Sequence, residues 1–331
     1  MIKIKNKTLK NYKFIDLFAG IGGFHLALNS FGAECVFVSE WDKEAAKTYY
    51  ENFNKIPNGD ITLIDEKEIP THDIICGGFP CQAFSVSGKQ KGFEDTRGTL
   101  FFDVARIINH HKPKVIFLEN VKNLVKHNNG DTFKTITSTL KELGYNVYTK
   151  VLNSSNYGLP QNRERIFFVG FRNDINSSGF EFPKTIEKTI SLNDILENEP
   201  LIEPIKRNDI SLNKLHKVGG NLFNETQFEN KPIQIGIVNK GGQGERIYHP
   251  NGHAITLSAY GGGVGSKTGL YYINDEVRKL TPRECARVQG FPDTYKINNK
   301  NTQAYKQFGN SVSVDVLQYV LLEINKVLEN N

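Results

Sequence analysis

The sequence predicts an α/β fold: a mostly parallel sheet covered by helices on both faces, and a smaller, loop-rich lobe that contains short strands. Between residues 13 and 170, short apolar runs alternate with segments of helical periodicity. A strand, a helix and a second strand at this spacing are typical of a parallel sheet. Near residue 190 the alternation ends, and glycine-rich stretches such as Gly241-Gly242 and Gly261-Gly262-Gly263 appear.

The sheet region is predicted element by element from runs of β-branched and aromatic residues and from helical periodicity. Strands are expected at Phe14–Phe18, Glu34–Ser39, Asp73–Cys76, Val115–Leu118, Val147–Leu152 and Ile166–Phe171. Helices are expected at Gly22–Phe31, Lys43–Phe53 and Leu100–His110, and Leu140–Tyr145 continues the alternation.

The smaller lobe is irregular from Asn193 to about Leu280, with β-like stretches at Ile233–Val238 and Gly269–Ile273. Helical signals return at Pro282–Val288, where Thr281 is the expected N-cap. The amphipathic segment Ser313–Leu328 is expected to pack back on the sheet. These features predict a sheet domain of residues 1–193 and 304–331, a lobe of residues 194–280, and a hinge region of residues 281–303.

The composition is that of a soluble protein, with 331 residues and a net charge of +5. The four cysteines form no C-x-x-C pair, so neither a zinc cage nor any other metal site is expected. So few thiols fit a reducing cytosol. The chain has no apolar run of about 18 residues and no signal-peptide pattern, so we expect a cytoplasmic protein with no membrane segment.

A glycine-rich turn after the first strand indicates a ligand at the edge of the sheet. Gly20 and Gly23 lie in this turn, where the backbone can approach a ligand closely. Glu40, 20 residues after Gly20, can bind ribose hydroxyls, Trp41 can stack on an adenine, and Asp60 can accept from the adenine amino group. The turn alone also fits a nicotinamide dehydrogenase, but it is not G-x-G-x-x-G. Together with the acids and Trp41 it favours S-adenosylmethionine, a nucleoside without a pyrophosphate.

Cys81 is the predicted nucleophile. It follows Pro80 in Gly-Phe-Pro-Cys-Gln, in a loop that leaves the carboxyl end of a central strand. Open α/β sheets place their ligands at this edge. A reachable thiol there can act as a thiolate nucleophile, whereas Cys76, within the strand, is expected to be a small core residue.

Glu119 follows the buried strand Val115–Leu118 and is therefore expected at the same edge as Cys81. Arg163 and Arg165 come directly before the strand Ile166–Phe171. If the arginine segment is extended, both arginines lie on one face. They are then either charged surface residues at the start of a strand, or a pair of guanidinium donors that bind a base carbonyl and a phosphate.

These groups suit methylation of cytosine at carbon 5. Addition of the Cys81 thiolate to carbon 6 makes carbon 5 nucleophilic, and a protonated Glu119 beside ring nitrogen N3 would lower the barrier. Burial would supply the raised carboxyl pKa that this requires. Arg165 would hold the cytosine O2, and loss of the carbon 5 proton after methyl transfer expels Cys81. A base within a duplex cannot reach such a pocket, so it must flip out.

The ordered motifs FAGIGG, Glu40-Trp41, GGFPCQAFS, ENV, QNRER, RECARVQGFP and QFGNSV resemble the cytosine-5 DNA methyltransferases of bacterial restriction–modification systems. The resemblance covers nearly the whole chain. It implies a Rossmann-like S-adenosylmethionine-dependent fold, the product S-adenosylhomocysteine, and catalytic roles for Cys81, Glu119, Arg163 and Arg165. The implied cofactor contacts, with the turn glycines, are Phe18, Gly20, Gly23, Glu40, Trp41, Asp60, Ile61, Pro80, Leu100 and Asn310. The loop 84–100 resembles the mobile active-site loop of the family, with Ser87 near the vacated base position.

The smaller lobe resembles the target-recognition domain of a family member that methylates the inner cytosine of GCGC. By this resemblance, Gln243 would fill the gap left by the flipped base and Arg246 would read guanine in the major groove. The other implied DNA contacts are Thr256, Tyr260 and Gly263. Residues 231 to 296 include nine Lys and Arg residues but only five Asp and Glu residues. This surplus of positive charge suits contact with DNA phosphates.

Three alternatives stay open at this point: a tRNA cytosine-5 methyltransferase with the same motifs, a non-catalytic DNA-binding regulator, and a dehydrogenase. The intact Cys81, Glu119 and Arg165 argue against an inactive protein. The family resemblance also implies double-stranded DNA as the substrate, a bacterial or phage source and a partner endonuclease of the same specificity. One active site for each target makes a monomer the natural expectation.

Overall fold

The computed structural model describes residues 4, 8–80, 100–186, 188, 190–213, 230–259, 264, 266 and 268–331. The chain folds into two compact units. Residues 2–152, 164–184 and 317–331 form the first, which we call the sheet unit, and residues 153–163 and 185–316 form the second unit. The domain limits predicted above were drawn from the change in sequence pattern and differ from this division; they stay a prediction.

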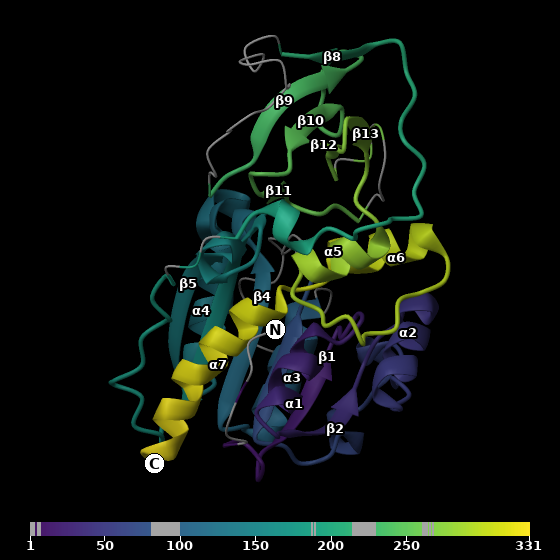
Figure 1. Cartoon of the computed structure of the whole chain (residues 1–331). Coiled ribbons are helices and arrows are strands. Elements are labelled where there is room, and N and C mark those ends of the chain that lie inside the picture. The colour runs from purple at the N-terminus through teal and green to yellow at the C-terminus, as the bar shows by residue number, and fades with distance from the viewer. Residues whose placement is uncertain are drawn as a thin grey trace. The chain divides into compact units, whose positions relative to one another are not determined.

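The sheet unit is built on six strands in the order β2-β1-β3-β4-β7-β5 (Figure 1). The strands are β1 (Lys13–Leu17), β2 (Glu34–Val38), β3 (Ile74–Gly78), β4 (Val115–Val121), β5 (Tyr145–Asn153) and β7 (Glu164–Arg172). β1 is parallel to β2 and β3, and β3 is parallel to β4, whereas β7 is antiparallel to β4. The predicted α/β fold with a mostly parallel sheet is thus confirmed, and β7 is the strand that runs in the opposite direction to its neighbour β4.

Helices cover both faces of this sheet. They are α1 (Gly23–Ser30), α2 (Lys43–Phe53), α3 (Leu100–His111), α4 (Asp131–Glu142) and α7 (Val314–Glu329). Alternate strand residues, such as Ile75 and Ile116, form one core cluster with α3 and α4, because side chains alternate between the faces of a strand. On the other face, Phe117 of β4 packs edge-on against Phe24 of α1, with ring centroids 5.1 Å apart.

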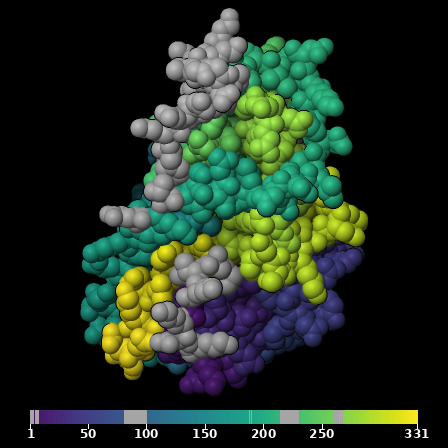
Figure 2. Space-filling model, in the orientation of Figure 1, coloured from purple at the N-terminus to yellow at the C-terminus, as the bar shows by residue number. Residues whose placement is uncertain are grey.

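The C-terminal helix α7 belongs mostly to the sheet unit, as its amphipathic pattern predicted. Gln318 donates a hydrogen bond of 2.8 Å to Ser30 at the end of α1. The amide of Asn176, after β7, donates to the side chain of Asn331 at 2.8 Å, and the yellow C-terminal residues lie beside teal residues in Figure 2. The last residues of the chain are therefore part of the packed unit.

Two predicted elements differ from the structure. The range Leu140–Tyr145 joins the end of α4 to the first residue of β5, because helical periodicity continues to Glu142 before the chain turns at Gly144. Strand β4 runs on to Val121 and includes Glu119 and Asn120, since its pairing with β7 continues there. The 3-10 turns are Ile61–Leu63, Glu66–Glu68, Lys122–Gly130, Ser154–Tyr157 and Leu192–Ile195.

The second unit holds a five-stranded sheet in the order β13-β12-β10-β9-β8 and a two-stranded pair of β11 with β6. The strands are β6 (Gln161–Asn162), β8 (Ile210–Leu212), β9 (Ile233–Val238), β10 (Arg246–His249), β11 (Ala254–Ile255), β12 (Leu270–Ile273) and β13 (Glu276–Arg278). Its core includes Ile235, Ile247 and Leu270. The predicted strands Ile233–Val238 and Gly269–Ile273 are confirmed.

Two helices complete the second unit. The predicted helix α5 (Pro282–Val288) is confirmed: the Thr281 hydroxyl accepts from the backbone of Glu284, and the Glu284 side chain accepts from the backbone of Thr281, which is a capping box. Helix α6 (Asn301–Asn310) was not predicted. None of the helices formed by the described residues has the length and apolar composition needed to span a bilayer.

Candidate active site

The carboxyl ends of β1, β2, β3 and β4 meet at one edge of the sheet, because these strands run parallel. The turn after β1, the turn after β2 and the Phe79-Pro80 segment after β3 leave the sheet from this edge. Strand β7 starts at the same edge, with Arg165 paired to Val121 of β4. Ligands of open α/β sheets bind here.

Glu40 joins two of these turns. The amide of Gly20 donates to Glu40 Oε2 and the amide of Asp42 donates to Oε1, both at 2.8 Å. Burial raises the pKa of Glu40, and these backbone donors act in the opposite direction. Each carboxylate oxygen keeps lone-pair capacity for a second donor, so the carboxylate can bind hydroxyl groups of a ligand.

The surroundings of Glu40 fit a nucleoside. Phe18 and Gly20 have φ values of 53° and 55°, and nothing lies within 4 Å of a Cβ built at Gly20. Backbone at this turn is therefore open to a ligand. Trp41 is 77% exposed and offers an indole face for an adenine. The Asp60 carboxylate, braced by the amide of Thr62 at 3.0 Å, adds a second acceptor.

Asp16 was not predicted as a site residue. It lies on β1, two residues before Phe18, and its side chain is fully buried. The Cys76 thiol donates to Asp16 Oδ1 at 3.8 Å, and burial raises the pKa of Asp16 to about 8. The signal in the sequence was an acid within an apolar strand, directly before the glycine turn. Cys76 itself is fully buried, as predicted for a core residue.

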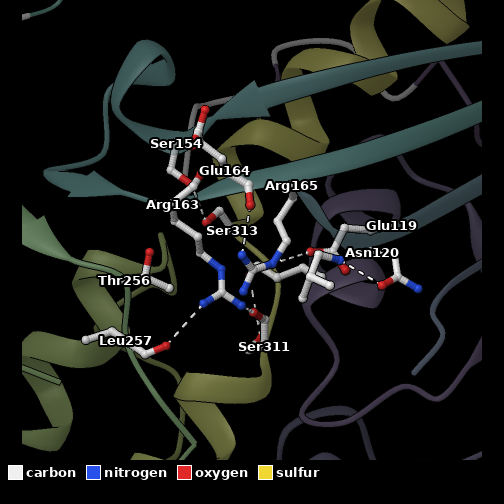
Figure 3. Close-up of polar contacts among 12 residues, drawn as sticks. Glu119, Asn120, Ser154, Arg163, Glu164, Arg165, Thr256, Leu257, Ser311 and Ser313 are labelled. Atoms are coloured by element: carbon white, nitrogen blue, oxygen red, sulfur yellow. Dashed lines mark hydrogen bonds and ion pairs between the residues drawn. The ribbon is translucent and has the colours of Figure 1, made fainter. Parts of the chain in front are cut away.

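Glu119 and Arg165 form an ion pair at the edge, with 3.0 Å between Arg165 Nε and Glu119 Oε1 (Figure 3). The side chains are 8% and 17% exposed, respectively. Arg165 Nη1 also donates to the carbonyl of Glu164 at 2.8 Å. The structure thus brings together the carboxyl and one of the two guanidinium groups that the sequence predicted.

Asn120 is a second residue that sequence reasoning missed. Its side-chain amide donates to the carbonyl of Phe79 at 2.7 Å, and its oxygen accepts from the amide of Val121. It is 2% exposed. Asn120 therefore ties the end of β4 to the segment that leads to Pro80. Its place beside Glu119 in the ENV motif was the available signal.

Several predicted site residues lie outside the described residues: Cys81, Ser87, Tyr260 and Gly263. Cys81 directly follows Pro80, which is exposed. Leu100 begins α3 and is partly buried. Within the described residues, no group of three His, Cys, Asp or Glu side chains could hold a metal ion.

Other predicted residues lie in the second unit. Asn310 is exposed at the end of α6. Arg163 is 2% exposed, and its guanidinium donates to the backbone carbonyls of Leu257, Gly309 and Ser311. Its contacts thus differ from those of Arg165.

The turn between β9 and β10 presents Gln243 and Arg246, both exposed. Glu245 braces this turn, since its carboxylate accepts from the side chain of Asn239 and the amide of Gly242, each at 2.8 Å. These donors lower the pKa of Glu245. The turn is therefore held in shape by a residue that the sequence did not single out.

The fold is that of an open α/β protein whose sheet edge carries a glycine turn with acidic acceptors and a carboxyl–guanidinium pair. Residues 12–326 match the family of C-5 cytosine-specific DNA methylases, and the chain belongs to this family. It is a methyltransferase that uses S-adenosylmethionine, which excludes the dehydrogenase alternative.

Two curated relatives support this assignment. The chain is 54% identical to the type II methyltransferase M.HhaI of Haemophilus parahaemolyticus, over 99% of this chain and 98% of that protein. It is 44% identical to M.HpaII of Haemophilus parainfluenzae, over 97% and 91%. Among solved structures, Dnmt2 methyltransferase of S. pombe has a TM-score of 0.69 at 20% identity, covering 96% of this chain and 99% of that one, and so supports the fold.

Proposed function

We propose that this protein transfers a methyl group from S-adenosylmethionine to carbon 5 of a flipped-out cytosine in duplex DNA, through a covalent Cys81 adduct. One observation carries the proposal: Glu119 and Arg165 are paired at 3.0 Å at the carboxyl end of β4. The neighbouring strand β3 ends at the same edge and continues through Phe79-Pro80 to Cys81. The acid and the guanidinium lie at this edge, and the proposal assigns the thiol that follows Pro80 to the same site.

The cofactor contacts of the sheet unit are proposed from the open turn and its acceptors. Glu40 would accept from the ribose hydroxyls, Asp60 from the adenine amino group, and Trp41 would stack on the ring. The other proposed contacts of this part of the site are Phe18, Gly20, Gly23, Ile61, Pro80 and Leu100. Asn310 is the remaining cofactor contact that we propose. When bound, the cofactor supplies a methyl group on a sulfonium.

Each reacting residue has one task in this mechanism. The Cys81 thiolate forms a bond to carbon 6 of cytosine. Glu119, which takes up a proton before this step, donates a proton or hydrogen bond at N3, where negative charge develops. Arg165 donates to O2 and holds the ring plane. Once carbon 5 carries the methyl group, its proton leaves to a base, the carbon 5–carbon 6 double bond re-forms, and the Cys81 sulfur is expelled.

We further propose GCGC as the target, with its inner cytosine methylated. The support is the resemblance of the recognition stretches, together with the braced turn that exposes Gln243 and Arg246. Arg246 suits guanine because its guanidinium can donate to O6 and N7 in the major groove. Gln243, Thr256, Tyr260, Gly263 and Ser87 are the other proposed DNA contacts.

The test uses the full chain, labelled S-adenosylmethionine and three substrates: a GCGC duplex, a duplex with the site scrambled, and tRNA. We expect label only in the GCGC duplex, and none with Cys81→Ser. Replacing the target cytosine by 5-fluorocytosine blocks loss of the group at carbon 5, so the Cys81 adduct should accumulate as a denaturation-resistant complex. Label in tRNA alone would support an RNA methyltransferase, and label in DNA at another sequence would refute GCGC while leaving the reaction intact.

A partner endonuclease of the same specificity, and a monomeric state, are further parts of the proposal. Plasmid methylated by this protein should resist cleavage by an endonuclease that cuts GCGC. Sedimentation in the presence of one target duplex should give a complex of one chain per site.

A further inference from the structure

We propose that Arg163 is a positioning residue, in place of the catalytic role predicted from the sequence. It holds together two segments of the second unit, residues 254–259 and 308–313, which carry the proposed DNA contact Thr256 and the proposed cofactor contact Asn310. The inference rests on the proposed function for the roles of those two residues. The clamp itself rests on contacts in the protein alone.

The guanidinium of Arg163 bridges the two segments. Nη1 donates to the carbonyl of Leu257 at 3.4 Å, and Nη2 donates to the carbonyls of Ser311 at 2.6 Å and Gly309 at 3.3 Å (Figure 3). The residue is 2% exposed. A buried cation requires such partners, and charge-assisted hydrogen bonds are the stronger kind. Donors directed at these carbonyls do not serve a substrate phosphate.

The segment 254–259 is also held to the strand that precedes Arg163. Ala254 and Ile255 pair with Gln161 and Asn162. The Thr256 hydroxyl donates to the carbonyl of Asn162 at 2.7 Å, and the amide of Leu257 donates to Gln161 Oε1 at 3.1 Å. The position of Thr256 is therefore set by residues 161–163.

Gln289 forms a second bridge on the same side. Its Nε2 donates to the carbonyl of Phe308 at 2.9 Å, and its Oε1 accepts from Ser313 at 2.9 Å and from Gln161 Nε2 at 3.3 Å. Gln161 and Gln289 are both fully buried. The segment 308–313 is thus fixed to the same strand as the segment 254–259.

The two segments also touch directly. A Cβ added at Gly309 would lie 2.5 Å from the amide nitrogen of Ala259 and would overlap the carbonyl group of Ser258. Only glycine allows this approach of the two backbones. The proposed DNA contact Thr256 and the proposed cofactor contact Asn310 thus share one anchor within the second unit.

The test is Arg163→Lys, which keeps the charge but replaces a planar fork by a point charge that cannot hold both segments. In the protein without DNA, we expect amide hydrogen exchange in 254–259 and 308–313 to rise by about tenfold or more. The KM for S-adenosylmethionine should rise, and the kcat/KM preference for GCGC over a site with one changed base should fall, each by about tenfold. General destabilisation would lower the active fraction equally for both sites and leave the preference unchanged.

A phosphate contact gives a different result. The salt dependence is measured on Arg163→Met, which removes the charge: losing one phosphate contact lowers the slope of log K against log salt by about 0.9, whereas the clamp predicts an unchanged slope. A lower slope, unchanged exchange or an unchanged site preference would each overturn the proposal. Arg172→Lys, at an exposed ion pair with Asp174, is the matched control and should change none of these quantities.

If Arg163→Lys fails to fold, Gly309→Ala probes the same junction from the other side. It should raise exchange in the same two segments, whereas Gly179→Ala, where a Cβ meets open space, should not. The exchange data need neither DNA nor catalysis, so they distinguish failure of the clamp from failure of the proposed function.

Discussion

Gly77 allows a close approach of β3 to β1 directly below the proposed active site. In the parallel register of the two strands it lies opposite Leu17. A Cβ at this position would overlap the carbonyl oxygen of Leu17 and lie 3.3 Å from the Leu17 Cβ. The clash is with backbone, which cannot swing away as a flexible side chain can. Gly77→Ala must therefore move the ends of the two strands apart by roughly 1 Å to restore ordinary contact.

This shift has a cost in stability and in rate. Overpacking of this kind costs about 1–3 kcal/mol in the free energy of unfolding, which lowers the Tm by about 3 to 10 °C in a unit of this size. The displaced strand leads to Phe79, Pro80 and Cys81. Because a misplacement of about 1 Å can reduce a rate by roughly a hundredfold, kcat should fall by about that factor while the protein stays folded.

The measurements are urea denaturation and methyl transfer to a GCGC duplex, with Gly179→Ala as control. A Cβ at Gly179 meets nothing within 4 Å, so that variant should stay within about 0.5 kcal/mol of the parent. If Gly77→Ala kept the parent free energy of unfolding within about 0.5 kcal/mol and kcat within about twofold, the reasoning from close strand approach would be refuted.

Three further substitutions test other parts of the molecule. Burial raises the pKa of Asp16 from 3.8 to about 8, so its contribution to stability is full below pH 4 and is lost as pH rises through 8. Asp16→Asn cannot ionise, so its free energy of unfolding should rise relative to that of the parent by up to about 1.4 kcal/mol per pH unit between pH 6 and 8. A difference in urea titrations that did not depend on pH would contradict this. Glu284 pairs with Arg278 through two 2.8 Å contacts at 0% and 5% exposure. Glu284→Gln leaves a buried cation and should cost about 3–5 kcal/mol in the free energy of unfolding, whereas Arg207→Gln, at an exposed pair, should leave the free energy of unfolding unchanged within the error of the measurement. Trp41→Ala should weaken S-adenosylmethionine binding by about five- to a hundredfold in calorimetry, from the loss of stacking, with an unchanged Tm, and equal affinity would remove Trp41 from the cofactor site.

The limits of some helices were predicted correctly because residues next to their ends in the sequence mark where the helix begins or ends. Helix α2 begins after Asp42, whose carboxylate caps the amides of Glu44 and Ala45, and it ends at Asn54 in the left-handed region. Helix α5 begins at a capping box with proline at its first position. These signals depend on neighbours in the sequence, so the sequence alone contains them.

The end of β4 shows where such reasoning stops. Its apolar run ends at Leu118, and the polar Glu119 and Asn120 suggested a loop. The strand continues because Phe167 and Ile166 of β7 pair with them, and the sequence does not show which strand lies alongside. The meeting of Glu119 and Arg165 depends on the same pairing, because β7 runs antiparallel to β4 and therefore starts at the edge where β4 ends.

The contrast between Arg163 and Arg165 follows from the route of the chain. Residues 153–163 belong to the second unit, and residue 164 returns the chain to the sheet unit. The partners of Arg163 lie 94 to 148 positions away, so no local pattern could separate its role from that of Arg165, whose partner Glu119 lies at the predicted sheet edge. Two arginines with the same chemistry and nearby places in one motif thus have different partners: Arg163 donates to backbone carbonyls of the second unit, and Arg165 pairs with Glu119, the carboxyl of the proposed mechanism.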